Sequence, residues 1–193
     1  MLKRLLTSIA AVMIVSVGAF ASEAPKNPKK LTPQGKYLSP KEALDMKKKE
    51  GNKVLFIDVR TPEELYFVGY PTVIDKNIPL ILIDYGRFKR NKNGKTLKYA
   101  DRPNKKFLAD FKDTLKERGL GKDAPVILMC RSGHRAAKAA KILNNAGYKN
   151  VYNLDQGFEG DKDAQKHRTV NGWKNAGLPY TYKVDEKIFT LVN

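Results

Sequence analysis

The chain of 193 residues contains one cysteine, and the residues that follow it suit a reactive thiolate. Cys130 is followed in order by Arg131, Ser132, Gly133, His134 and Arg135. The two guanidinium groups, and the imidazole when it is protonated, favour the thiolate over the thiol, and the thiolate is the nucleophilic form of cysteine. A single cysteine has no partner for an internal disulfide and no resolving thiol. We therefore expect Cys130 to act as a nucleophile and not as half of a redox pair.

The cysteine stands between a predicted buried strand and a predicted helix. Residues 126–129, Val-Ile-Leu-Met, form a continuous apolar run that is typical of a strand buried on both faces. Apolar residues at helical spacing follow over 136–143, and Gly147 ends the pattern. Ligands of open α/β sheets bind where strands end and helices begin, and the amides of a helix N-terminus attract anions. The sequence therefore predicts an anion-binding loop around Cys130.

The rest of the pattern predicts strands that alternate with helices. We expect helices over 40–50, from 62 onward, over 107–118 and around Trp173, and strands over 54–59 and 151–154, with a strand or an irregular buried segment over 78–83. Ser39 with Glu42, and Thr61 with Glu64, have the spacing of capping boxes at the starts of two of these helices. The alternation predicts an α/β fold with a mostly parallel central sheet and helices on both faces.

Four segments follow one another along the chain. Residues 1–21 read as a signal peptide, because Lys3 and Arg4 precede an apolar run that ends in the small-x-small pattern Ala19-Phe20-Ala21. We expect cleavage before Ser22 and a periplasmic or secreted protein, with an uncleaved anchor as the alternative. The other segments are a polar linker or surface arm over 22–38, a domain over 39–182 and a tail over 183–193. Residues 84–104 lack periodicity and read as a long surface insertion in that domain.

The chain is strongly basic, with a net charge of +17. Removal of residues 1–21 takes away two cations, Lys3 and Arg4, and no acid, which leaves +15. Such a charge attracts small anionic substrates or acidic partners, although a solvated basic surface would look the same. Nucleic acid is not expected, because export separates the chain from it and no recognised binding motif is present. After signal cleavage, no stable membrane association is expected.

Three stretches together resemble the rhodanese family of sulfurtransferases. The loop 130–136, Cys-Arg-Ser-Gly-His-Arg-Ala, is similar to the active-site loop of that family. Residues 56–64 resemble its first strand and Asp-x-Arg turn, and 147–158 resemble the strand after its catalytic helix. The resemblance covers about residues 39–180, and the stretch from Gly157 to Pro179 is similar to exported bacterial members. The family's usual Gly-His-Ile-Pro-Gly-Ala stretch is replaced at 69–74, and the 84–104 insertion is longer than in minimal members.

The resemblance implies a two-step sulfur transfer through a Cys130 persulfide. Cys130 would take sulfur from thiosulfate or polysulfide and pass it to cyanide, a thiol or a protein acceptor, with residues 131–135 binding the anionic sulfur. Asp58 is the expected partner of Arg135, in a catalytic or a purely structural role. Arg60, Arg131 and His134 are candidates to meet the donor, although Arg60 and His134 also read as solvated surface groups. No metal and no organic cofactor are expected, since one cysteine and two separated histidines form no ligand set.

Two alternatives remain at this point. A cysteine phosphatase or arsenate reductase needs five residues between its cysteine and arginine, whereas Arg135 is the fifth residue after Cys130 and leaves only four. The smaller ring suits a single sulfur atom better than a phosphate. A sulfur carrier or partner-binding module with little turnover is the second alternative, and the intact cysteine loop argues against a fully inactive one.

Overall fold

The computed structural model describes residues 22–90 and 93–190, so the predicted signal peptide lies outside the described residues. Four α-helices are described: α1 (Pro40–Glu50), α2 (Pro62–Val68), α3 (Phe107–Glu117) and α4 (His134–Asn145). The strands are β1 (Tyr37–Leu38), β2 (Leu55–Asp58), β3 (Tyr70–Pro71), β4 (Lys76–Asn77), β5 (Ile81–Arg90), β6 (Leu97–Pro103), β7 (Val126–Met129), β8 (Val151–Leu154) and β9 (Tyr180–Thr181). Short 3-10 turns lie at Pro28–Lys30 and Gly51–Lys53.

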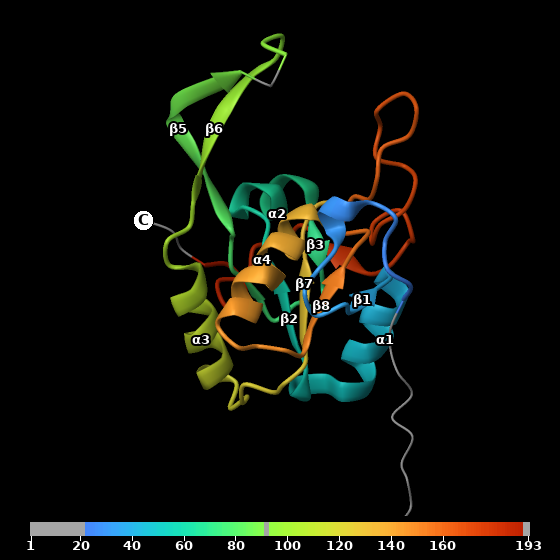
Figure 1. Cartoon of the computed structure of the whole chain (residues 1–193), viewed down its shortest axis with the longest axis vertical. Helices are drawn as coiled ribbons and strands as arrows, with labels where there is room; N and C mark the ends of the chain where they lie inside the picture. Colours follow the sequence, from blue (N-terminus) through green and yellow to red (C-terminus); the bar gives the residue numbers. More distant parts are fainter. Residues whose placement is uncertain (1–21, 91–92, 191–193) are drawn as a thin grey trace, which may run out of the picture.

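The central sheet has the strand order β1-β8-β7-β2-β4, and all of its neighbouring strands are parallel (Figure 1). This confirms the expected α/β fold with a parallel sheet. β7 lies in the middle of the sheet between β2 and β8, so the segment after its last residue, Met129, emerges at the centre of one sheet edge. The strand that carries the cysteine loop is therefore supported on both sides.

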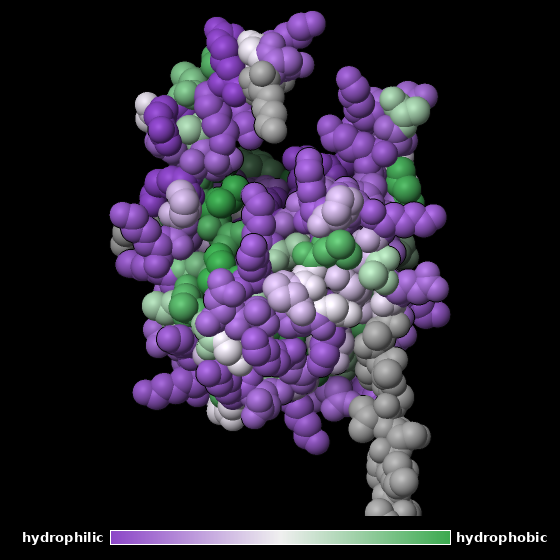
Figure 2. Space-filling view, viewed as in Figure 1, coloured by the Kyte–Doolittle hydropathy of each residue, from purple (hydrophilic) through white to green (hydrophobic). Residues whose placement is uncertain are grey.

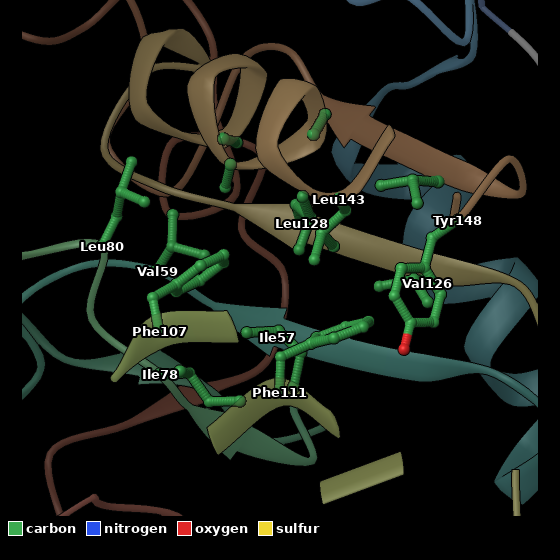
Figure 3. Close-up of a cluster of buried hydrophobic side chains, with 14 of the residues drawn as sticks. Ile57, Val59, Ile78, Leu80, Phe107, Phe111, Val126, Leu128, Leu143 and Tyr148 are labelled. Carbon is green, nitrogen blue, oxygen red and sulfur yellow. The ribbon is translucent and has the colours of Figure 1, made fainter. Parts of the chain in front are cut away.

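Helices cover both faces of this sheet, because the buried strands are apolar on both sides. Odd-numbered residues of β2, such as Leu55 and Ile57, pack with residues of α3 and α4. Phe56, and Val54 just before the strand, pack with residues of α1 and α2 on the opposite face. Figure 3 shows Phe107 and Phe111 of α3 beside Ile57. The alternation fixes the register of β2, since a slip of one residue would exchange the two faces.

Capping boxes lie at the starts of α1 and α2, the two helices that flank β2, as the sequence predicts. The Ser39 hydroxyl accepts from the Glu42 amide while the Glu42 carboxylate accepts from the Ser39 amide, and Thr61 and Glu64 repeat this arrangement. A proline at the first helical position of α1 and α2 costs no hydrogen bond there. Only three residues, 59–61, thus separate the end of β2 from the first residue of α2, which places Glu64 close to the edge where β7 ends.

Two expectations from the sequence differ from the structure. Residues 84–104 are not an irregular loop, because most of them form the antiparallel hairpin of β5 and β6. Trp173 is buried but lies in a series of turns and not in a helix, with its indole N–H donating to the Pro179 carbonyl at 3.0 Å. Of the two readings of the 22–38 segment, linker or surface arm, the structure shows the arm, and its last residues form β1, the edge strand beside β8.

Among the described residues, no helix is both long enough and apolar enough to span a bilayer.

Candidate active site

Cys130 lies directly after the central strand β7 and lines a pocket of about 530 Å³. The residue is only 1% exposed, yet it lines this pocket. The pocket wall comes from the cysteine loop, the start of α2, the base of the hairpin and one arginine from the turns near the C-terminus: Thr61, Glu64, Ile81, Ile83, Lys98, Tyr99, Ala100, Asp101, Cys130, Arg131, Ser132, His134, Arg135 and Arg168. The buried cysteine therefore adjoins a defined pocket.

The backbone of the cysteine loop leaves its amides free to bind an anion. The carbonyl of Cys130 accepts from the Phe158 amide at 2.8 Å, and the carbonyl of Arg131 accepts from the Glu159 amide at 3.0 Å. These bonds hold the loop from its carbonyl side. Within the described part of the chain, no hydrogen-bond acceptor is found for the amides of residues 131–135. Such a row of unpaired amides before a helix is a binding site for a negatively charged group.

Two glycines allow the loop to pack this closely against the segment after β8. Gly133 has φ of +87° at the N-cap of α4, and a Cβ there would lie 2.1 Å from the Asp155 carbonyl oxygen. Gly157 has φ of +66°, and a Cβ there would lie 2.5 Å from the Arg131 carbonyl carbon. Both positions therefore require glycine for conformation and for space.

Arg135 is held by Glu64, and the predicted pairing of Arg135 with Asp58 is wrong. The Arg135 guanidinium donates to the two oxygens of the Glu64 carboxylate at 2.5 and 2.6 Å. Although burial lowers the pKa of Arg135, the hydrogen bonds and charge of Glu64 raise it above its usual value, with Cys130 adding to the rise. Arg135 therefore stays cationic beside the Cys130 thiol. Its ion pair with Glu64 also joins α4 to α2.

Asp58 instead binds Arg60, and neither residue faces the pocket. Their side chains are fully buried, and Arg60 Nη2 lies 2.7 Å from Asp58 Oδ2. Arg60 also donates to the Gly69 carbonyl at 2.9 Å, and its guanidinium carbon lies 4.2 Å from the centre of the Phe158 ring. The expectation that Arg60 meets an anionic donor is therefore wrong. The pair anchors the turn after β2 and the segment that supports the cysteine loop.

Arg131 and His134 do line the pocket, with different charges. Arg131 pairs with Glu159 at 2.8 Å and is about half exposed. His134 lies 3.3 Å from the Ser132 hydroxyl and 3.2 Å from the Asn27 amide nitrogen. Burial and the positive charge of Lys30 lower the pKa of His134, so its imidazole is neutral at neutral pH. His134 thus orders the loop and the N-terminal arm without adding a cation.

Arg168 is a pocket residue that sequence reasoning missed. It lies in a polar stretch without helical or strand periodicity, so no pattern in the sequence singles it out. One of its terminal nitrogens donates to the Gly160 carbonyl, while its Nε is buried without a hydrogen-bond partner. Arg168 forms no ion pair within the described residues, whereas Arg131 and Arg135 are each paired with a glutamate. Burial, together with the charge of Arg131, lowers the pKa of Arg168.

The base of the hairpin supplies an apolar wall that the sequence also did not predict. Ile81 and Ile83 of β5 face the pocket together with Tyr99 and Ala100 of β6. Figure 1 shows the hairpin and the loop near residue 165 projecting from the same end of the domain. Because Arg168 belongs to that loop and Tyr99 to the hairpin, the pocket opens between the two projections.

Cys130 and the unpaired amides after it lie at the centre of a parallel sheet with cations nearby, an arrangement suited to binding an anion. A family model described as the rhodanese-like domain matches residues 39–164, and the chain belongs to this family. The fold is thus that of the rhodanese-type sulfurtransferases, which confirms the resemblance stated from the motifs.

The chain is also similar to individual proteins and to a solved structure. The chain is 34% identical over 141 residues to an uncharacterized protein of Rickettsia rickettsii, the RP600 homolog, covering 73% of this chain and 93% of that protein. The crystal structure of Rv0390 from M. tuberculosis is similar with a TM-score of 0.54 and 30% identity, covering 75% of this chain and 96% of the other. A shorter match of 39 residues, 44% identical, is to the thiosulfate sulfurtransferase GlpE of Tolumonas auensis, covering 20% of this chain and 37% of that protein.

In the described ranges, no group of three or more His, Cys, Asp or Glu side chains could hold a metal ion. The chemistry that the site offers is that of the cysteine, the free amides and the surrounding guanidinium groups.

Proposed function

We propose that the protein is a sulfurtransferase that carries sulfane sulfur on Cys130. The Cys130 thiolate attacks the outer sulfur of thiosulfate, a new S–S bond forms, the S–S bond of thiosulfate breaks, and sulfite leaves with the bonding electron pair. The persulfide anion then gives its terminal sulfur to an acceptor such as cyanide, which leaves as thiocyanate and restores the thiolate. Charge and atoms balance in both steps without an added oxidant or reductant.

The observation that carries this proposal is the row of unpaired amides over residues 131–135 beside a cysteine that lines a pocket. Negative charge sits on the terminal sulfur of the persulfide, and amides that are already oriented stabilise it at no cost in reorganisation. The ring has four residues between Cys130 and Arg135, which suits one sulfur atom and is one residue shorter than the loop of cysteine phosphatases.

The sulfur donor has an anionic part that leaves after transfer. Arg168 is the residue best suited to bind this part. Its neighbours Arg131 and Arg135 are neutralised by glutamates, while Arg168 keeps an unpaired, buried Nε beside the same pocket. The sulfonate of thiosulfate, or the far end of a polysulfide, would satisfy that donor group. The apolar wall of Ile81 and Ile83 leaves room for a longer sulfur chain next to it.

We further propose that the protein acts outside the cytoplasm. This rests on the sequence of residues 1–21, whose charge, apolar run and Ala19-Phe20-Ala21 ending are those of a signal peptide. Comparison of the N-terminus of the protein recovered from the producing cell with the predicted start at Ser22 tests it. An N-terminus that still contains the apolar run would contradict cleavage.

Steady-state turnover with thiosulfate and cyanide tests the activity. We expect thiocyanate to form with the wild type and not with Cys130→Ser, and tetrathionate, polysulfide and mercaptopyruvate complete the donor panel. Release of phosphate from p-nitrophenyl phosphate without any thiocyanate formation would overturn the assignment in favour of a phosphatase. A persulfide that forms on Cys130 but is discharged only slowly by cyanide would instead identify a sulfur carrier.

A further inference from the structure

The β5–β6 hairpin projects from the domain as a separate arm (Figure 1). Its two strands pair only with each other in the described sheets and do not extend the central sheet. Leu82 and Ala100 are buried at its base, and the Tyr85 hydroxyl donates to a Glu63 carboxylate oxygen of α2 at 2.9 Å. An isolated two-stranded hairpin is only marginally stable in water, so such an arm gains stability from whatever covers it.

Three aromatic side chains form an exposed cluster on this arm, here called the hairpin aromatic cluster: Tyr85, Phe88 and Tyr99. Tyr85 and Phe88 are each 59% exposed, and Tyr99 is 47% exposed. The ring centres of Phe88 and Tyr99 are 5.0 Å apart in a stacked arrangement, and those of Tyr85 and Tyr99 are 5.2 Å apart edge to face. Contiguous exposed aromatic groups of this kind mark interaction surfaces, since aromatic residues are enriched in them.

The same arm is strongly basic. Residues 81–103 contain seven lysines and arginines and two aspartates, a net charge of +5. Arg87 pairs with Asp84 at 3.1 Å and Lys89 pairs with Asp101, which uses both acids of the hairpin. Seven cations against two carboxylates leave the hairpin with a net positive charge. An acidic partner is the complement of this surface.

The hairpin aromatic cluster is continuous with the Cys130 pocket. Tyr99 belongs to the cluster and also lines the pocket, together with Ile81 and Ile83 at the base of the arm. A partner that binds the cluster would therefore lie beside the pocket that Cys130 lines. The pocket lies between the hairpin and the loop that contains Arg168, and Figure 2 shows a hollow between these two projections. A narrow polypeptide segment fits between two such projections, whereas a flat bilayer does not.

We propose that the hairpin is a docking arm for an acidic polypeptide segment that bears the cysteine accepting sulfur from Cys130, an inference that rests on the proposed sulfurtransferase function. The partner's acidic groups bind the basic arm, and its backbone and side chains cover the hairpin aromatic cluster. Its thiolate attacks the terminal sulfur of the Cys130 persulfide. The S–S bond to Cys130 breaks, Cys130 leaves as the thiolate, and the persulfide anion now stands on the partner cysteine.

Two short synthetic peptides test this proposal. Each has one central cysteine, flanked by glutamates in one peptide and by glutamines in the other. Cys130 is first loaded with sulfur, and the rate at which each peptide gains one sulfur atom is followed by mass spectrometry. Binding is measured separately by fluorescence anisotropy, with Cys130→Ser protein and labelled peptides whose cysteine is replaced by serine, so that docking is read even without transfer.

We compare the double variant Arg87→Gln/Arg90→Gln with a matched control, Lys41→Gln/Lys48→Gln. Arg87 and Arg90 are exposed on the arm and lie outside the pocket lining, while Lys41 and Lys48 are exposed on α1. Both variants lose the same charge. A third variant, Phe88→Ser, removes an exposed ring of the cluster without changing charge. Turnover of thiosulfate and cyanide shows whether each variant keeps an intact site.

We expect the wild type to transfer sulfur to the glutamate peptide about tenfold faster than to the glutamine peptide, and to bind it more tightly by a similar factor. The arm variant should lose most of this preference, the α1 control should keep it, and about 1 M salt should abolish it. Phe88→Ser should slow transfer to both peptides. All three variants should retain thiosulfate–cyanide turnover within about twofold of the wild type.

Equal binding and equal transfer with the two peptides would overturn the docking arm. Equal losses in the arm variant and the α1 control would overturn it as well, because the effect would then be one of net charge. Binding of the wild type, but not of the arm variant, to phosphatidylglycerol vesicles without any peptide preference would assign the arm to a membrane surface and refute the proposal. Failure of Cys130 to acquire sulfur from any donor would instead refute the sulfurtransferase function, while peptide binding still decides the docking.

Discussion

Glu64 and Arg135 face each other across the cysteine loop and form a two-point ion pair, with distances of 2.5 and 2.6 Å. The same Glu64 carboxylate accepts from the Thr61 amide at 3.1 Å and so completes the capping box of α2. One carboxylate therefore fixes the start of α2 and holds the first turn of α4. Since Cys130 lies between these two helix starts, the geometry of the thiol depends on this pair.

Replacement of Glu64 by glutamine should destabilise the protein and disturb the loop. Glutamine retains the capping geometry but removes the charge that binds Arg135. Both side chains are about one-fifth exposed, so we expect a loss of about 2 kcal/mol, between the values for exposed and fully buried pairs. Urea unfolding measures this loss. Glu63→Gln, which changes the neighbouring carboxylate, should stay within about 0.5 kcal/mol of the wild type, and an equal loss in both variants would contradict this role.

The contribution of Glu64 should disappear in acid. Although burial raises the pKa of the Glu64 carboxyl, the hydrogen bonds and charge of Arg135 lower it below the ordinary value of 4.5. The ionised pair therefore stabilises the fold fully above pH 4.5, and this stabilisation is lost as the pH falls through the lower pKa of the folded state. The difference in unfolding free energy between wild type and Glu64→Gln should shrink when urea unfolding is repeated at about pH 3. A difference that grows in acid would contradict the assignment.

The sequence predicts the position of the cysteine loop but not the pairing of its arginines. Strong local signals exist for the apolar run of β7, for the capping boxes and for the glycines, because these depend on neighbouring residues. The partner of Arg135 depends on the directions in which side chains leave two different elements. Asp58 and Glu64 are both acids near the same sheet edge, and the fully buried pair of Asp58 with Arg60 leaves Glu64 to bind Arg135.

The sequence pattern did not predict the β5–β6 hairpin, for a different physical reason. Its pairing register shifts between Asp84 and Phe88, so the alternation of apolar and polar residues is interrupted in the middle of β5. Many of its side chains are exposed on both faces, which removes the remaining periodicity. Arg168 has no local signal at all, because its place in the pocket comes from long-range packing of the turns that follow β8.

Replacement of Gly133 by alanine should damage the loop far more than a glycine change elsewhere. A Cβ at this position meets the Asp155 carbonyl at 2.1 Å, and the φ of +87° is strained for alanine. We expect a loss of about 2 kcal/mol or more in unfolding free energy, together with at least about a tenfold loss in persulfide formation. Gly121→Ala is the control, since nothing lies within 4 Å of a Cβ there. Wild-type loading in Gly133→Ala would show that the close approach is not needed.

Replacement of Arg168 by glutamine should weaken the use of anionic donors. A hydrogen bond to a charged group contributes about 1.5–3 kcal/mol, so we expect kcat/KM for thiosulfate to fall by about ten- to hundredfold. Arg168→Lys should recover part of this loss because it keeps the charge. Discharge by cyanide of a persulfide formed beforehand should change by less than about twofold, since the donor is absent from that step.

The matched control for Arg168 is Lys162→Gln, which removes an exposed cation from the same loop outside the pocket lining. We expect its kinetics with thiosulfate to stay close to those of the wild type. Equal effects of the two substitutions would assign the change to general electrostatics, and an unchanged kcat/KM in Arg168→Gln would remove Arg168 from the donor site.

Intact-mass measurement after incubation with thiosulfate decides whether Cys130 carries sulfane sulfur. We expect the wild-type chain to gain one sulfur atom, cyanide to remove it, and Cys130→Ser to gain none. A wild-type chain that gains no sulfur from thiosulfate, tetrathionate or polysulfide, or a Cys130→Ser chain that gains as much as the wild type, would contradict this expectation.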